Sequence, residues 1–135
     1  MGSKGDIVKS FKQYLNEEVS KQQLNQVEDF ADKLFKAIGL DIDFTKHFAD
    51  RVNDSRNKSP ITPAELIRLF KETYKKYGKV IAKLGDKAEA VIKDMMTDIN
   101  MPFVLNLKKD GMLHLIAKTI LRKKDFKTSN KKYTI

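Results

Sequence analysis

The chain has 135 residues, of which 41% are hydrophobic and 33% are charged. It is therefore too apolar for a disordered chain and too charged for a membrane protein. It has no cysteine and two histidines, which excludes disulfides and a nucleophilic cysteine and argues against a multi-histidine zinc site. No glycine-rich phosphate loop is present. We expect one domain over residues 1–135, with no cofactor, no metal and no membrane partner.

The net charge of +9 is concentrated near the end of the sequence. Residues 1–60 carry ten basic and ten acidic side chains, whereas residues 101–135 carry nine basic and two acidic ones. A localised cationic field attracts polyanions and speeds their encounter with the protein. We therefore expect a nucleic acid as the partner, with an acidic protein as the alternative. The oligomeric state stays open.

Apolar residues at steps of three and four predict helices over residues 6–19, 21–38 and 43–54. Gly39 is well placed to end the second of these helices. A further helix begins at Thr62, because Thr62, Pro63 and Glu65 suit the cap, the first helical position and a capping box. Gly78 either ends this helix or lies inside it.

Residues 86–98 fit a helix slightly better than a strand, and from residue 102 the apolar period becomes two. The second pattern predicts a β-hairpin over about residues 102–122. A three-residue turn ending at Gly111 pairs Leu107 with Leu113 and gives one apolar face. A short last strand is expected at residues 133–135. The fold class is α+β, with N-terminal helices packed on a small C-terminal antiparallel sheet.

The opposite face of the predicted hairpin carries a row of polar and cationic side chains, namely Asn106, His114, Lys118 and Arg122. These residues either bind phosphate or form an ordinary solvated sheet face. Thr119 points to the apolar side on this register, and basic residues continue beyond the hairpin. Phe126 and Tyr133 are candidates for stacking on bases. The predicted nucleic-acid-binding residues are Arg56, Asn106, His114, Lys118, Thr119, Arg122, Lys123 and Lys124.

His47 and Arg51 form the predicted catalytic pair, because residues four apart on a helix share one face. Histidine is the usual general acid or base near neutral pH, and the guanidiniums of Arg51 and Arg56 suit a phosphate. The alternative is a solvated helix whose arginines pair with Asp50 and Asp54. Asp94, Asp98 and Asp110 show no spacing typical of a metal site.

Three motifs follow one another along the chain: His47-x-x-x-Arg51 with Arg56; Ile61, Thr62, Glu65 and Leu66; and the basic stretch at residues 118–124. Their order resembles that in phage-encoded nuclease-like domains of the barnase–EndoU–colicin–RelE superfamily. The resemblance covers about residues 44–128. A second resemblance links residues 10–17 to the start of small proteins from tailed marine phages.

The superfamily resemblance implies an α+β fold, RNA as the substrate and cleavage without a metal, through attack of the ribose 2′-hydroxyl on the adjacent phosphate. It implies that His47 is the acid or base and that Arg51 and Arg56 clamp the phosphate. Lys118, Thr119 and Arg122 would line the sheet side. It divides the chain into a helical part (residues 1–40), a nuclease-like part (41–128) and a basic tail (123–135), and implies a cytoplasmic location, in the host if the gene is a phage's.

No carboxylate is placed as the base for this reaction. Two alternatives to a ribonuclease therefore stay open, a non-catalytic nucleic-acid-binding module and a phage virion or accessory interaction protein.

Overall fold

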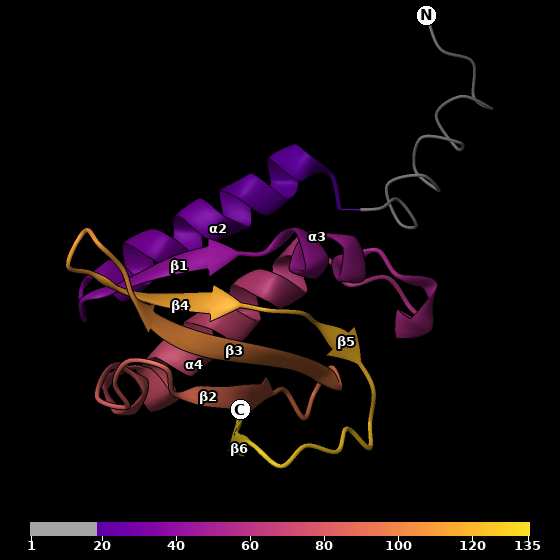
Figure 1. Ribbon diagram of the computed structural model, residues 1–135. Helices are drawn as coiled ribbons and strands as arrows, with labels where there is room; N and C mark the ends of the chain where they lie inside the picture. The colour runs from indigo at the N-terminus through magenta and orange to yellow at the C-terminus, as the bar shows by residue number, and fades with distance from the viewer. Residues whose placement is uncertain (1–18) are drawn as a thin grey trace, which may run out of the picture.

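The computed structural model describes residues 19–135, in which helices and a sheet form two layers (Figure 1). The predicted helix over residues 6–19 lies outside the described residues, apart from its last position. None of the described helices is long and apolar enough to cross a membrane. The elements are α2 (Lys21–Lys36), β1 (Leu40–Phe44), α3 (Lys46–Val52), η1 (Ser55–Asn57), α4 (Pro63–Ala82), β2 (Glu89–Lys93), β3 (Ile99–Leu107), β4 (Leu113–Ala117), β5 (Leu121–Arg122) and β6 (Lys131–Thr134).

The α+β class is confirmed, but the sheet is mixed rather than wholly antiparallel. Its strand order is β1-β4-β3-β2-β6, with β5 beside β3. The pairs β1–β4 and β2–β6 are parallel, and the other pairs are antiparallel. The helices α2 and α4 lie on one face of the sheet, as Figure 1 shows. We call the other face the open face.

Both long helices begin with a capping box. Ser20 caps α2 together with Gln23, which was not predicted. Thr62 caps α4 together with Glu65, as predicted. Gly39 follows α2 with a φ of +80°, which glycine adopts without strain. Gly78 lies inside α4, where a β-carbon would come within 3.1 Å of the Ile38 side chain. Its lack of a side chain therefore lets α4 pack closely on the end of α2.

One predicted helix is shorter than expected, and another is wrong. Residues 40–44 form strand β1, and the third helix begins only at Lys46, capped by the Thr45 side chain. Residues 89–93 form strand β2, so the helix favoured over residues 86–98 is replaced by its strand alternative. Four successive residues of β2 are buried, because the strand is covered on both faces. A strand that is buried on both faces lacks the alternation that identifies a half-exposed strand.

The hairpin register is confirmed by the pairing of β3 with β4. Leu107 pairs with Leu113, Leu105 with Leu115 and Phe103 with Ala117. Gly111 has a φ of +81° and its N–H donates to the Lys108 carbonyl across the turn. The apolar face of the hairpin is directed toward the helices, so the hydrophobic pattern fixed the register.

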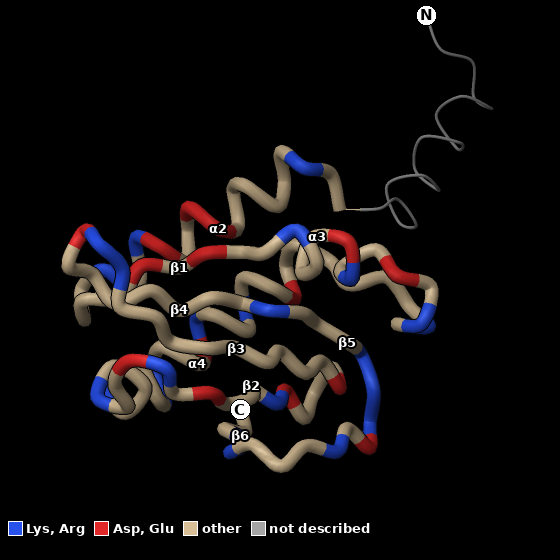
Figure 2. Tube along the Cα trace, in the orientation of Figure 1, with Lys and Arg blue, Asp and Glu red and all other residues tan. Residues whose placement is uncertain are grey.

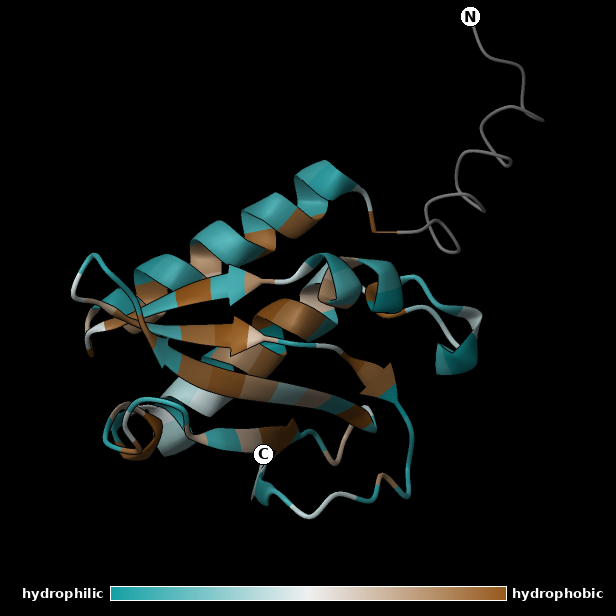
Figure 3. Ribbon diagram, in the orientation of Figure 1, coloured by the Kyte–Doolittle hydropathy of each residue, from teal (hydrophilic) through white to brown (hydrophobic). Residues whose placement is uncertain are grey.

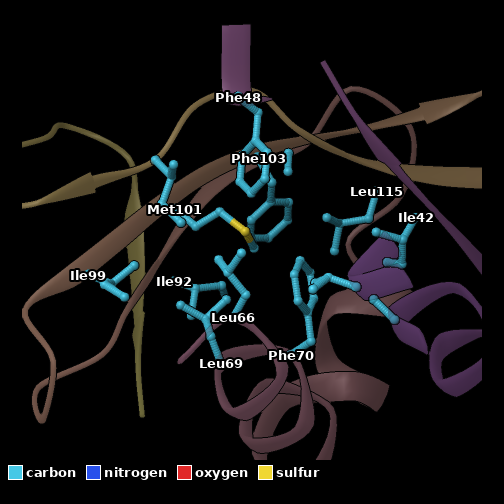
Figure 4. Packing of buried hydrophobic residues seen from close by; sticks show 14 of the residues in the cluster. Ile42, Phe48, Leu66, Leu69, Phe70, Ile92, Ile99, Met101, Phe103 and Leu115 are labelled. Atoms are coloured by element: carbon cyan, nitrogen blue, oxygen red, sulfur yellow. The ribbon is translucent and has the colours of Figure 1, made fainter. Parts of the chain in front are cut away.

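The core lies between the sheet and the helices. Leu66, Leu69 and Phe70 of α4 meet Met101 and Phe103 of β3 (Figure 4). Hydrophobic colour predominates on β4 and on parts of β3, whereas α2 is largely hydrophilic (Figure 3). Tyr133, a predicted stacking residue, is also buried, with its ring 5.0 Å from that of Tyr77, so its aromatic face is not offered to a base.

Side chains of α2 cap the outer edge of β1. The N–H of Ile42 donates to Asp32 Oδ1 at 2.9 Å, and the N–H of Phe44 donates to Glu28 Oε2 at 2.7 Å. Burial and the charges of Asp43, Asp29 and Asp32 raise the pKa of Glu28, although its hydrogen bond to Phe44 acts in the opposite direction. The edge donors of β1 are therefore satisfied by side chains rather than by another strand.

Replacement of Asp32 tests this edge cap. Asp32→Ala removes the acceptor for the Ile42 N–H and should lower the free energy of unfolding by about 1 kcal/mol. Asp32→Asn keeps an acceptor oxygen and should lower it less. Urea unfolding at constant m-value measures the difference, with exposed Asp29→Ala on the same helix as the control. Equal loss in Asp29→Ala and Asp32→Ala would contradict the assignment.

Candidate functional site

A one-residue bulge separates β4 from β5 and changes the predicted cationic row. Phe103 pairs with Ala117, but Asn100 pairs with Leu121 rather than with residue 120. Because neighbouring residues on a strand point to opposite faces, the extra residue moves Arg122 to the helix side of the sheet. His114 and Lys118 stay on the open face. The prediction that these three cations form one row is therefore wrong.

Arg122 ties β5 to the first turn of α4. Its Nη2 is 2.8 Å from Glu65 Oε1 and its Nη1 is 2.9 Å from Glu65 Oε2. The same guanidinium donates to the carbonyls of Ser59, Pro60 and Thr97. Burial alone would raise the pKa of Glu65, but hydrogen bonds from Arg122 and the Thr62 N–H hold it below the ordinary value. With its donors engaged in this way, Arg122 acts as a structural residue.

His114 is the centre of an ion-pair cluster on the open face, at the end of the sheet near the hairpin turn. Its Nδ1 is 2.7 Å from Asp43 Oδ2, and its Nε2 is 3.0 Å from Asp110 Oδ2 and 3.4 Å from Asp41 Oδ2. Lys108 Nζ lies 2.9 Å from the same Asp43 oxygen. Burial lowers the pKa of His114, but the hydrogen bonds and charges of Asp110 and Asp43 outweigh it and raise the pKa above 6.5.

The cluster also contains a set of groups that could hold a metal ion. Asp41, Asp110 and His114 each offer a ligand atom, and these atoms lie within 4.8 Å of one another. In the structure His114 bonds to the carboxylates directly, so the cluster is already held together by charge. His114 binds the protein's own carboxylates and is not directed at a phosphate.

The predicted catalytic residues come together on and after α3. Arg51 Nε donates to His47 Nε2 at 3.3 Å, and Arg51 Nη1 is 2.7 Å from Asp54 Oδ2. Arg56 Nη2 is 3.0 Å from the same Asp54 oxygen. The two arginines thus share one carboxylate, as in the alternative interpretation, while His47 and Arg56 remain exposed.

The His47 group and the His114 cluster lie at opposite ends of β4. Thr45, two residues before His47, bonds to the carbonyls of Ala117 and Lys118 at one end of the strand. His114 pairs with Asn106 at the other end, which is about 10 Å away along a strand. The two histidines therefore do not form one site.

Residues 118–132, which we call the cationic segment, hold seven basic side chains and one acidic side chain. The segment leads from the end of β4 to β6, where its basic residues stand out in Figure 2. Lys118 pairs with Glu89, and Arg122 is held by Glu65. Lys123, Lys124 and Lys127 are exposed and have no acidic partner within 4.0 Å among the described residues.

Buried polar groups hold the main chain of the cationic segment against the sheet. Lys93 Nζ donates to the carbonyls of Lys123 and Lys124 at 2.9 and 3.0 Å. Asn100 Nδ2 donates to the carbonyls of Lys123 and Leu121 at 2.8 and 3.1 Å. Since the carbonyls are fixed from the inside, the exposed side chains of Lys123 and Lys124 project from an anchored main chain.

The remaining predicted residues lie apart from this anchored stretch. Asn106 is exposed beside the hairpin turn, and Thr119 is half-buried in the link between β4 and β5. Sequence reasoning missed Lys93 and Asn100, because a lysine and an asparagine in a short apolar run give no pattern that predicts burial. It also missed Asp41 and Asp43, whose strand was not predicted.

Charge is segregated across the sheet. The α2 and β1 elements, at one edge, carry five acidic and three basic side chains, and the cationic segment runs to the other edge (Figure 2). The α4 helix, counted together with Lys83 at its end, adds five lysines and an arginine. Its acidic residues are Glu65 and Glu72. A polyanion would therefore meet a favourable field on the β6 side of the molecule.

No protein-family model, no curated protein and no solved structure matches this chain. The resemblance to the barnase–EndoU–colicin–RelE superfamily therefore stays a prediction.

The His114 cluster predicts a pH-dependent stability. Because the pKa of His114 is raised in the folded protein, its contribution is complete below 6.5 and is lost as the pH rises through the folded value. At about pH 5.5 the wild type should have a larger free energy of unfolding than His114→Gln. The difference between the two proteins should be smaller at about pH 8.5. Urea unfolding at both pH values, with exposed His47→Gln as the control, measures it. A difference that grew with pH would contradict the cluster.

Proposed function

We propose that this protein binds RNA through the cationic segment. The observation that carries the proposal is that Lys123, Lys124 and Lys127 are exposed and have no acidic partner within 4.0 Å among the described residues, while Lys93 and Asn100 anchor the main chain of the first two. An anchored main chain lowers the entropy lost when these side chains meet a ligand. Because these lysines have no acidic partner to displace, they can bind the phosphates of a nucleic acid directly.

The distribution of charge supports a polyanion over a compact acidic partner. The cationic segment extends over fifteen residues with seven basic side chains and one acidic side chain, whereas α2, β1 and the hairpin turn hold six of the acidic residues that the structure describes. A nucleic acid can follow such an extended cationic surface along its backbone. A cytoplasmic location and a phage origin rest on the sequence resemblance and stay predictions.

Neutralisation of the three lysines tests the proposal. In the triple variant that combines Lys123→Gln, Lys124→Gln and Lys127→Gln, the dissociation constant for a single-stranded RNA oligonucleotide should rise on the order of 100-fold near 0.1 M salt. The slope of log K against log salt should fall by about 2, because each phosphate contact contributes about 0.7. Fluorescence anisotropy at several salt concentrations measures both quantities.

The matched control removes the same charge elsewhere. Lys21, Lys33 and Lys36 are exposed on α2, which packs against β1 at the other edge of the sheet. Their triple replacement by glutamine should change the affinity much less. Equal losses in the two triple variants would show that net charge alone attracts the RNA, and a salt-insensitive affinity would reject the proposal. A wild-type protein that binds an acidic protein but no nucleic acid would favour the alternative partner.

RNA cleavage is a second candidate function, favoured by the grouping of His47, Arg51 and Arg56. Arg51 and Arg56 both contact Asp54, and Arg51 also donates to His47. The α3 helix begins beside the carbonyl of Lys118, the first residue of the cationic segment. A substrate phosphate would have to displace Asp54 to reach both guanidiniums. His47 would then serve as the general acid or base at an exposed position.

Cleavage without metal is tested by incubating the protein with mixed RNA in EDTA. If His47 is the general acid or base, His47→Ala should slow cleavage by at least about 100-fold. Asp50→Asn, on the same exposed helix, is the control and should retain activity. Intact RNA after incubation with the wild type, or equal cleavage by His47→Ala, would remove this candidate and leave RNA binding unaffected.

A further inference from the structure

The β2–β3 turn, residues 94–98, presents two neighbouring methionines to solvent. Met95 is 63% exposed and Met96 is 77% exposed, more than any other large hydrophobic side chain among the described residues. An isolated exposed apolar residue needs no explanation, but two long ones side by side on a short turn form an apolar tip.

This turn is held rigidly from below. The Asp94 carboxylate is buried, forms an ion pair with Arg68 of α4 and accepts from the Met96 N–H at 2.9 Å. The Met95 N–H donates to the Ile135 carbonyl, and the Asp94 N–H donates to the Ile99 carbonyl. Asp98 adopts a φ of +62°, which is unfavourable for a residue other than glycine. The exposure of the methionines is thus maintained by a buried ion pair and a strained residue.

The methionine turn is bonded to the start of the cationic segment. The Lys123 N–H donates to the Asp98 carbonyl at 2.9 Å, and Arg122 Nη1 donates to the Thr97 carbonyl at 2.8 Å, so the cationic segment runs beside the turn. Arg68 of α4 forms an ion pair with Asp94 at the base of the turn. The methionine tip is therefore adjacent to the start of the cationic segment.

A ligand that fits this surface carries negative charge and exposes flat apolar groups beside it. Single-stranded RNA has both properties, because its bases are unstacked and accessible. In a duplex the bases are stacked within the helix and mainly the phosphates meet the protein. Thioether side chains make favourable contacts with aromatic rings, and methionine is one of the residues that proteins insert between bases.

We infer that Met95 and Met96 contact the bases of single-stranded RNA while the neighbouring lysines hold its phosphates. This inference rests on the proposed function and names the form of nucleic acid that the site selects. The bases give an apolar, salt-independent component of the affinity, and the lysines give the salt-dependent component.

The test compares Met95→Gln, Met96→Gln with the wild type on three ligands: a single-stranded RNA, the same RNA as a duplex, and inorganic polyphosphate, which has charge but no bases. Glutamine keeps the side-chain length and removes the thioether. The dissociation constant for single-stranded RNA should rise about 3-fold to 30-fold with an unchanged salt slope. Affinities for the duplex and for polyphosphate should stay the same.

Leu107→Gln is the matched control, because Leu107 is 55% exposed at the far end of β3 from the methionine turn and should leave all three affinities unchanged. Equal losses on all three ligands, unchanged binding to single-stranded RNA, or a changed oligomeric state in the methionine variant would overturn the inference. A separate result would contradict the proposed function, namely unchanged RNA binding after replacement of Lys123, Lys124 and Lys127.

Discussion

The contact between Arg122 and Glu65 is the constraint on which the surface of this protein depends. It joins the last part of the hairpin to the first turn of α4, and it exists because the bulge before β5 turns Arg122 toward the helices. The same guanidinium holds the loop before α4 and the methionine turn through main-chain carbonyls. One side chain thus sets the relative positions of α4, the β2–β3 turn and the start of the cationic segment.

Below that surface, buried polar groups replace apolar packing. Lys93 and Asn100 lie on the open face of β2 and β3, and their donors bind carbonyls of the segment that crosses them. The Asn100 Oδ1 atom is buried and has no hydrogen-bond partner among the described residues. Burial of the Lys93 ammonium and the Asn100 amide costs solvation energy, which their hydrogen bonds to carbonyls of the cationic segment offset. The cationic segment is therefore held by directional hydrogen bonds rather than by an apolar surface. The side chains of Lys123 and Lys124 can then reach solvent although their carbonyls are bound from the inside.

Much of the fold could be predicted, because the strongest signals are local. The capping box at Thr62 and the alternation around Gly111 fixed α4 and the hairpin register. Strand β1 was not predicted, since it merges with the helical spacing of Phe44 and Phe48. Strand β2 was predicted only as the alternative to a helix, since it is buried on both faces. The predicted cationic row is wrong because a bulge at residues 118–120 moves Arg122 to the other face of the sheet. A period-two pattern does not reveal such a bulge. His47 and Arg51 were correctly placed together, but the groups that position the lysines are distant in sequence.

The caps that α2 places on β1 also bear on how copies of the chain behave at high concentration. Asp32 and Glu28 occupy the N–H groups that a neighbouring strand would need, so this end of the sheet is closed to strand addition. The opposite end is β6, where Thr134 offers its carbonyl to Tyr77 and Lys131 and Lys132 lie exposed. Mutual repulsion of those lysines disfavours stacking of two copies there, and a bound polyanion would remove that repulsion. Fibre-like self-association should therefore be most favourable near charge balance between protein and polyanion, and should begin at β6.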